Sequence, residues 1–115
     1  MINKERLIKT FCDLVQIDSP SGEEENVALF LIDFLENLGL KTQRDSYGNL
    51  IAKSSGKPQI ILSGHMDTVE PGRGIKPQIQ QDKIVSDGTT ILGGDAKAGV
   101  SAILEGLQSI FEDHH

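Results

Sequence analysis

The feature that most constrains the fold is a short apolar run, residues 59–63, which leads directly into a histidine and an aspartate. Ile60, Ile61 and Leu62 stand together in that run, and turn-forming residues precede it. A short apolar run without alternation predicts a strand that is buried on both faces. Such a strand must be covered by other elements, so the sequence favours an α/β layer architecture.

Three stretches with helical spacing flank this strand. They cover residues 3–16, 21–39 and 96–111. Ser21, followed three residues later by Glu24, predicts a capping box at the start of the second helix. The apolar residues expected to face the core are Leu7, Phe11, Leu14, Val15, Val27, Phe30, Leu31, Phe34, Leu35, Leu38, Val100, Ile103, Leu104, Leu107, Ile110 and Phe111.

Two hairpins are expected between the helices. One spans residues 40–54, and a weaker one spans residues 75–85 with its tip at Gln81 and Asp82. A glycine-punctuated loop, residues 87–94, follows. The predicted buried strand has few neighbours and helices to cover it, so we expect the sheet to be incomplete and residues 1–115 to be part of a larger domain.

The composition excludes several classes of function. The formal net charge is −6 and no Lys/Arg cluster is present, which argues against nucleic acid and membrane surfaces as partners. No apolar run approaches the ~18 residues of a membrane-spanning helix. A single cysteine, Cys12, excludes an internal disulfide, and its apolar neighbours favour a buried hydrophobe over a nucleophile. These features predict a cytoplasmic protein.

His65 and Asp67 follow the apolar run, at the end of the strand where ligands bind in open α/β sheets. Imidazole is the commonest protein ligand for metals. A carboxylate two residues later lies on the same side of an extended backbone and can accept the other ring N–H. The pattern is also common by chance, so these two residues alone leave metal binding open.

Asp95 follows Gly93 and Gly94 and precedes the last predicted helix. One interpretation is an ordinary N-cap that favours the helix dipole. The other is a carboxylate that bridges two metal ions, as in two-metal hydrolytic sites. The residues alone favour the N-cap.

Together the two segments resemble a known signature. Gly-His-x-Asp-x-Val around His65, followed by Gly-Gly-Asp-x-Lys-x-Gly around Asp95, resembles the metal-binding motifs of the co-catalytic zinc exopeptidases, which include peptidase T, the aminoacylases and carboxypeptidases. Residues 69–77 and 86–93 look most similar to the peptidase T, or tripeptidase-like, branch. Residues 18–24 resemble the linker between the first two helices of the same family.

The resemblance implies the roles of individual residues. His65 binds one zinc ion, Asp95 bridges two, and Asp67 is the active-site carboxylate that orients His65. The bond after the bridging aspartate, Asp95–Ala96, is expected to be cis. It also implies a fold, the N-terminal part of a three-layer zinc-exopeptidase catalytic domain, and a complete enzyme that is a homodimer acting on short peptides.

This sequence departs from the family pattern at two places and lacks other parts of it. Ala96 stands where tripeptidase-like relatives have a second aspartate, and Gly94 stands where they have alanine. The paired glutamates, a further Asp, a distal His and the inserted dimerisation domain are expected to lie outside residues 1–115. We therefore expect this polypeptide alone to be inactive.

Two alternatives stay open on the sequence. Hydrolysis of N-acyl amino acids is a close variant of the peptidase function. A natural short module that only associates with another chain is the non-enzymatic alternative.

Overall fold

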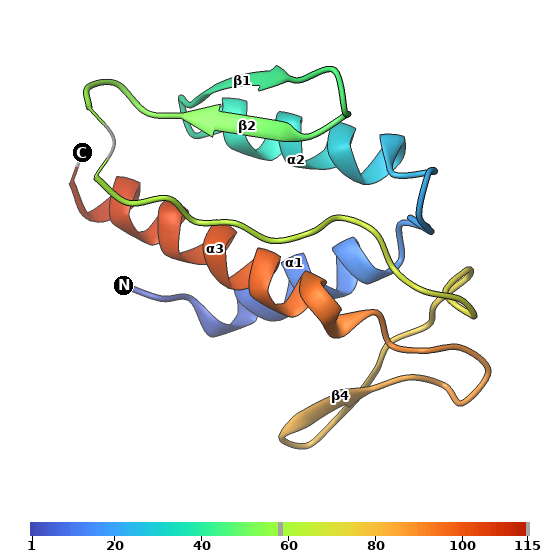
Figure 1. Ribbon diagram of the computed structural model, residues 1–115. Helices are drawn as coiled ribbons and strands as arrows, with labels where there is room; N and C mark the ends of the chain where they lie inside the picture. Colours follow the sequence, from blue (N-terminus) through green and yellow to red (C-terminus); the bar gives the residue numbers. More distant parts are fainter. Residues whose placement is uncertain (58, 115) are drawn as a thin grey trace.

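The computed structural model describes residues 1–57 and 59–114. Three helices and two β-hairpins make up the fold (Figure 1). In chain order the elements are α1 (Lys4–Val15), α2 (Glu25–Asn37), β1 (Lys41–Arg44), β2 (Leu50–Lys53), β3 (Gln78–Gln80), β4 (Lys83–Val85) and α3 (Gly94–Asp113).

The periodic segments form the predicted elements. The side chain of Asn3 caps α1 by accepting a hydrogen bond from the Arg6 N–H, and α2 is followed by Gly39 at φ +95°. Strands β1 and β2 pair antiparallel around the 45–49 turn, and β3 pairs antiparallel with β4 around the predicted tip, where Gln81 has a positive φ. Helix and hairpin predictions are thus confirmed to within a few residues.

The core lies between the three helices and the first hairpin. Leu14 of α1 is fully buried there, and Phe30 and Phe34 of α2 stack at its margin with ring centroids 6.5 Å apart. The buried residues of this cluster are Leu14, Val27, Leu31, Leu35, Leu40, Val100 and Leu104. A smaller cluster of Phe11, Val15 and Ile75 packs the chain before β3 against α1, and the partly buried Ile84 of β4 lies against it.

The predicted strand at residues 59–63 is not formed. The segment runs along α3 as extended chain (Figure 1), but within the described residues it pairs with no other strand. Ile60 and Ile61 are 78% and 88% exposed rather than buried. A strand exists only where neighbours satisfy its N–H and C=O groups, and no described segment lies in position to do so.

The predicted capping box is also wrong. The N-cap of α2 is Glu24, and in the described chain no side-chain hydrogen bond caps this helix. The Ser21 hydroxyl instead donates to Asp67, 46 residues away, and a Glu24 carboxylate oxygen accepts from the Gly22 N–H. A tertiary partner for Ser21 and a different local partner for Glu24 replace the reciprocal pairing that the spacing suggested.

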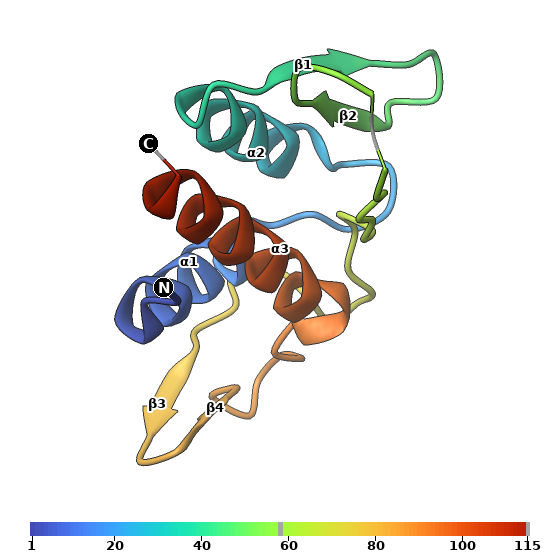
Figure 2. The same ribbon diagram turned by 90° about the vertical axis from the view of Figure 1, so that its left-hand side faces the viewer.

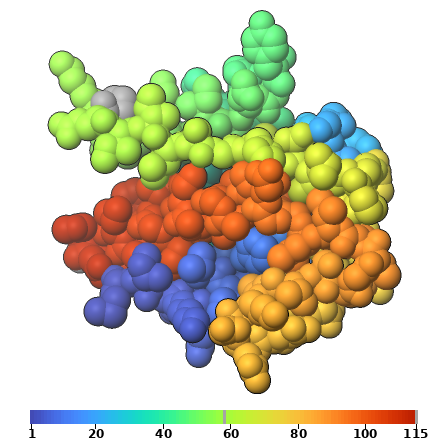
Figure 3. All heavy atoms as spheres, turned by 60° about the horizontal axis from the view of Figure 1, so that its bottom comes forward, coloured from blue at the N-terminus to red at the C-terminus, as the bar shows by residue number. Residues whose placement is uncertain are grey.

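Helix α3 is only half covered. Val100 and Leu104 are buried, whereas Ile103, Leu107 and Ile110 line a shallow apolar hollow beside Leu62. Seen from the side in Figure 2, the second hairpin projects away from the helices, and in Figure 3 the α3 surface lies open next to the extended segment.

The overall dimensions agree with an α3 helix whose apolar surface is only partly covered by other elements. The radius of gyration is 14.5 Å, against about 13 Å for a compact chain of this length. The extents along the principal axes are 45 × 36 × 20 Å. The fold is mixed α/β with small sheets. Among the described helices none is both long and apolar enough to cross a membrane.

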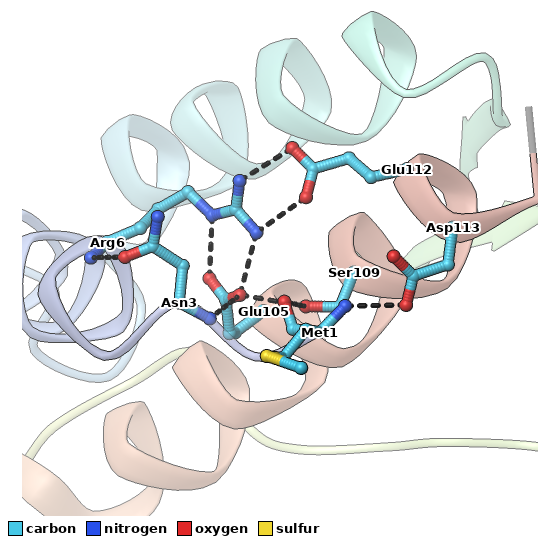
Figure 4. A network of polar contacts seen from close by, with 7 residues as sticks. All are labelled: Met1, Asn3, Arg6, Glu105, Ser109, Glu112 and Asp113. Atoms are coloured by element: carbon cyan, nitrogen blue, oxygen red, sulfur yellow. Dashed lines mark hydrogen bonds and ion pairs between the residues drawn. The ribbon is translucent and has the colours of Figure 1, made fainter.

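A polar network joins α1 to the C-terminal half of α3 (Figure 4). The Arg6 guanidinium donates to both carboxylate oxygens of the buried Glu105, at 2.8 and 2.7 Å, and also to Glu112. The Asn3 N–H and the Ser109 hydroxyl donate to the same Glu105 carboxylate. This network joins the start of α1 to α3, which carries Asp95 at its other end.

Candidate metal centre

The linker between α1 and α2 supports the segment that carries His65. The Thr68 N–H donates to the Ser19 carbonyl at 2.8 Å, and the Ser19 hydroxyl donates to the Met66 carbonyl at 2.9 Å. Ser19 is fully buried, and Pro20 forms a parallel bridge with Thr68. His65 therefore lies on extended chain that is anchored from one side and open on the other.

The His65 ring lies between two aspartates. Its Nδ1 is 2.9 Å from the backbone carbonyl of Asp67 and 3.0 Å from Asp67 Oδ1, whereas its Nε2 is 3.0 Å from Asp95 Oδ1. The structure thus brings together all three residues singled out in the sequence. Asp67 lies beside one ring nitrogen and Asp95 beside the other.

The charges of the site reinforce one another. The pKa of His65 is raised, chiefly because the charged, doubly protonated ring can donate from Nε2 to the Asp95 carboxylate, and Asp67 contributes further. The pKa of Asp67 is lowered, chiefly by the hydrogen bond from Ser21 and also by His65. Asp67 is therefore a carboxylate, and the side chain of Asp95 is 97% exposed and accessible from solvent.

The start of α3 places Asp95 at the ring. Gly93 has φ +82°, and Asp95 and Ala96 have non-helical dihedrals, so regular helix begins at Lys97. The Asp95–Ala96 peptide bond is cis, as the sequence resemblance predicted. No side chain within residues 1–57 and 59–114 caps α3, so the N-cap interpretation of Asp95 does not hold.

The donor set fits a cation between His65 and Asp95. Only acceptors face Nδ1, so Nδ1 carries the proton, and in a neutral ring Nε2 is then a bare lone pair. That lone pair faces a carboxylate oxygen, an arrangement that is favourable only with an extra proton or a metal ion between them. Two ligand atoms on one tetrahedral zinc lie about 3.3 Å apart, close to the 3.0 Å observed here.

The site offers two side chains that could bind a metal ion, His65 and Asp95, rather than a complete set of ligands. In the part of the chain that the structure describes, no group of three or more His, Cys, Asp or Glu side chains is arranged to hold a metal ion. Asp67 does not face the lone pair of Nε2 but binds the opposite edge of the ring. Metal bound by His65 and Asp95 alone would therefore be weakly held.

Lys97 has a role that the sequence did not reveal. Its side chain is 1% exposed, and its Nζ donates to the Ile17 carbonyl at 2.8 Å. Burial lowers the pKa of Lys97 to about 8, and the nearby Asp18 opposes that shift. This hydrogen bond thus joins the first regular turn of α3 to the chain that follows α1. Lys97 stands between Ala96 and Ala98, and nothing in that sequence indicates that its charged side chain is buried.

Cys12 agrees with its sequence interpretation as a hydrophobe rather than a nucleophile, although it is half-buried rather than buried. Partial burial raises the pKa of its thiol, which disfavours the nucleophilic thiolate.

Gly93→Ala should destabilise the start of α3. An alanine here would have to adopt φ +82°, and its Cβ would lie 3.2 Å from Ile75 Cδ1. We expect a loss of about 1–2 kcal/mol in the free energy of unfolding, measured by urea denaturation. Gly99→Ala is the matched control, because it lies inside the same helix with open space around it and should stabilise by about 0.5–1 kcal/mol. Equal effects of the two substitutions would contradict this account.

Thr68→Val should stabilise the protein. Thr68 is 2% exposed, and its hydroxyl oxygen has no hydrogen-bond partner among the described residues. Valine keeps the shape and the backbone bond to Ser19 while removing the buried hydroxyl. The expected gain is about 1 kcal/mol in the free energy of unfolding, from chemical denaturation. A loss of stability would mean that the hydroxyl is satisfied.

Comparisons with known proteins place this geometry in a wider context. No family model matches the chain. It is 42% identical to a tripeptidase from Staphylococcus aureus, with a TM-score of 0.91 over 99% of this chain and 34% of that one. It is 38% identical to the aminopeptidase PepT of Bacillus cereus, with a TM-score of 0.90 over 98% and 34% of the two chains. It is also 38% identical to the uncharacterized protein YqjE of Bacillus subtilis, over 99% of this chain and 34% of that protein.

Fold and sequence together define the class that the chain resembles: it matches the N-terminal part of peptidases of this kind, as the resemblance to the co-catalytic zinc exopeptidases predicted. The two solved structures are a tripeptidase and PepT, in agreement with the resemblance to the peptidase T, or tripeptidase-like, branch that the motifs around His65 and Asp95 indicated. The chain spans about a third of the length of the relatives that it matches.

Proposed function

We propose that the complete protein is a metal-dependent exopeptidase that removes an N-terminal residue from short peptides. The observation that carries this proposal is the His65 ring, whose Nδ1 faces only acceptors and whose Nε2 faces the Asp95 carboxylate at 3.0 Å. This arrangement suits a cation, and the similarity to a tripeptidase and to PepT supports peptides as substrates.

Each of the three residues has a distinct role in this proposal. His65 Nε2 and Asp95 would hold the metal, and Asp95 would be shared with a second ion. Asp67 keeps the proton on Nδ1, which leaves the Nε2 lone pair free and fixes the ring. Zinc, when bound, supplies Lewis-acid activation of the scissile carbonyl and of water.

We propose further that residues 1–115 are the N-terminal part of the catalytic domain and do not hydrolyse peptides alone. The glutamates of the linker before α2, Glu23 and Glu24, already have partners. Glu23 pairs with Arg73 at 2.6 Å, and Glu24 accepts from the Gly22 N–H. Neither is therefore free to serve as the general base that the family resemblance calls for.

The direct test is to capture the protein from its native source with an antibody against this segment and to measure its mass and activity. We expect a mass several times 12.5 kDa and zinc-dependent release of the first residue of a tripeptide. Cleavage of N-acyl amino acids without cleavage of peptides would move the substrate to the acylase variant. A mass near 12.5 kDa without hydrolysis would contradict the enzyme proposal.

A second candidate function, association with another chain, is favoured by one observation. Ile60, Ile61 and Leu62 form an exposed extended segment beside the apolar hollow of α3. An extended segment that pairs with no described strand can accept a further strand. Homodimerisation of the complete enzyme is a separate proposal that rests on the family resemblance alone. Sedimentation of the 115-residue chain over a range of concentrations tests the association candidate, and a monomer throughout would exclude it.

A further inference from the structure

The two oxygens of the Asp67 carboxylate have different partners. Asp67 Oδ1 lies 3.0 Å from His65 Nδ1, and Asp67 Oδ2 accepts a hydrogen bond from the Ser21 hydroxyl at 2.5 Å. Ser21, Asp67, His65 and Asp95 therefore form one continuous chain of contacts from the α1–α2 linker to the start of α3.

The Ser21 hydroxyl is not used for local structure. The sequence spacing suggested that it would cap α2, yet the N-cap of that helix is Glu24, and Ser21 lies four residues before the first helical residue. Its hydroxyl donates instead to the Asp67 carboxylate, 46 residues away. A serine at a linker position has no need of such a partner for folding alone, because its hydroxyl could be satisfied by solvent.

The rest of the linker is anchored on both halves of the site. Ser19 is hydrogen-bonded to Met66 and Thr68 on the His65 side, and the Ile17 carbonyl accepts from Lys97 on the Asp95 side. Ser21 is therefore carried on backbone whose position relative to both metal-ligand candidates is fixed.

We propose that Ser21 is a positioning residue for the metal centre, acting through Asp67 on the orientation and tautomer of His65. The inference rests on the proposed function of this site. Without the Ser21 hydroxyl, the Asp67 carboxylate keeps one partner and can turn away from Nδ1. The Asp67 carbonyl remains as a second acceptor at 2.9 Å, so the tautomer preference weakens rather than disappears.

The test compares Ser21→Ala with Ser21→Thr, which restores a hydroxyl. Ser54→Ala, at an exposed position after β2, is the matched control. The first readout is the ¹⁵N spectrum of His65 in the metal-free chain at about pH 9, above the ordinary titration range of histidine. The second is the zinc dissociation constant from the same resonances, with thermal unfolding recorded for every variant.

Ser21→Ala should lower the fraction of the Nδ1–H tautomer and raise the zinc dissociation constant about three- to tenfold. Ser21→Thr should return both values to within about twofold of the parent chain. The inference is overturned if Ser21→Ala matches Ser54→Ala in both readouts, or if Ser21→Thr is as impaired as Ser21→Ala. If zinc at millimolar concentration gives no response at His65 in the parent chain, the metal-ligand role proposed for His65 and Asp95 fails, while the metal-free tautomer still decides the role of Ser21.

Discussion

Arg6→Ala should lower the free energy of unfolding by about 3 kcal/mol. The Glu105 side chain is 2% exposed and depends on Arg6 for two of its hydrogen bonds. Removing the guanidinium leaves a buried carboxylate with only the Asn3 N–H and the Ser109 hydroxyl. The expected loss lies at the lower end for buried pairs, because Arg6 itself is 22% exposed.

The matched control is Lys9→Ala on the same helix. Lys9 pairs with Asp13 at 2.6 Å, but both side chains are exposed. An exposed pair of this kind contributes less than about 0.5 kcal/mol. Urea denaturation of both variants measures the contrast, and similar losses would show that the Glu105 network does not hold α1 against α3.

The same network predicts how stability depends on pH. Hydrogen bonds from Arg6, then from Asn3 and Ser109, hold the pKa of Glu105 at about 2 in the folded chain. A carboxyl with a lowered pKa contributes its stabilisation above the ordinary glutamate value and loses it as the pH falls toward the folded value. Stability of the parent chain should therefore decline between about pH 4.5 and pH 2, and this decline should be shallower in Arg6→Ala.

Asp67→Ala should weaken zinc binding about tenfold. Asp67 Oδ1 holds the proton of His65 on Nδ1, which leaves Nε2 as the metal-binding atom. Loss of such a partner of a histidine ligand costs about 10- to 100-fold in metal affinity. The lower figure is expected here because the backbone carbonyl of residue 67 still accepts from Nδ1 at 2.9 Å.

The control for this substitution is Asp82→Ala at the tip of the second hairpin. It removes the same charge at a position away from the site. Calorimetric titration with zinc gives both dissociation constants. Equal affinity of Asp67→Ala and Asp82→Ala would show that Asp67 does not support the ring.

Local patterns predicted local structure well. The apolar spacing of α1 and α2 and the glycine at residue 39 are short-range signals, and the elements that they specify formed where expected. The strand at residues 59–63 failed for the opposite reason. Its apolar composition is that of a central strand, but a strand is a property of a pair, and within the described chain no neighbour is available.

The candidate site was predictable in part. His65 and Asp67 are two residues apart, so their pairing followed from extended geometry, whereas Asp95 joined them only through the family resemblance. The spacing of Ser21 and Glu24 pointed to a helix cap, and the true partner of Ser21 lies 46 residues away. Lys97 and the Arg6–Glu105 pair gave no sequence signal, because their burial depends on how α3 packs.

The most direct test of the central claim, that His65 and Asp95 together bind metal, is a zinc titration of the ¹⁵N-labelled chain. We expect zinc to shift the Nε2 resonance of His65 and leave its Nδ1 protonated, with the effect largely lost in Asp95→Ala. A shift at Nδ1 instead, or a response of His65 that Asp95→Ala leaves unchanged, would contradict the claim.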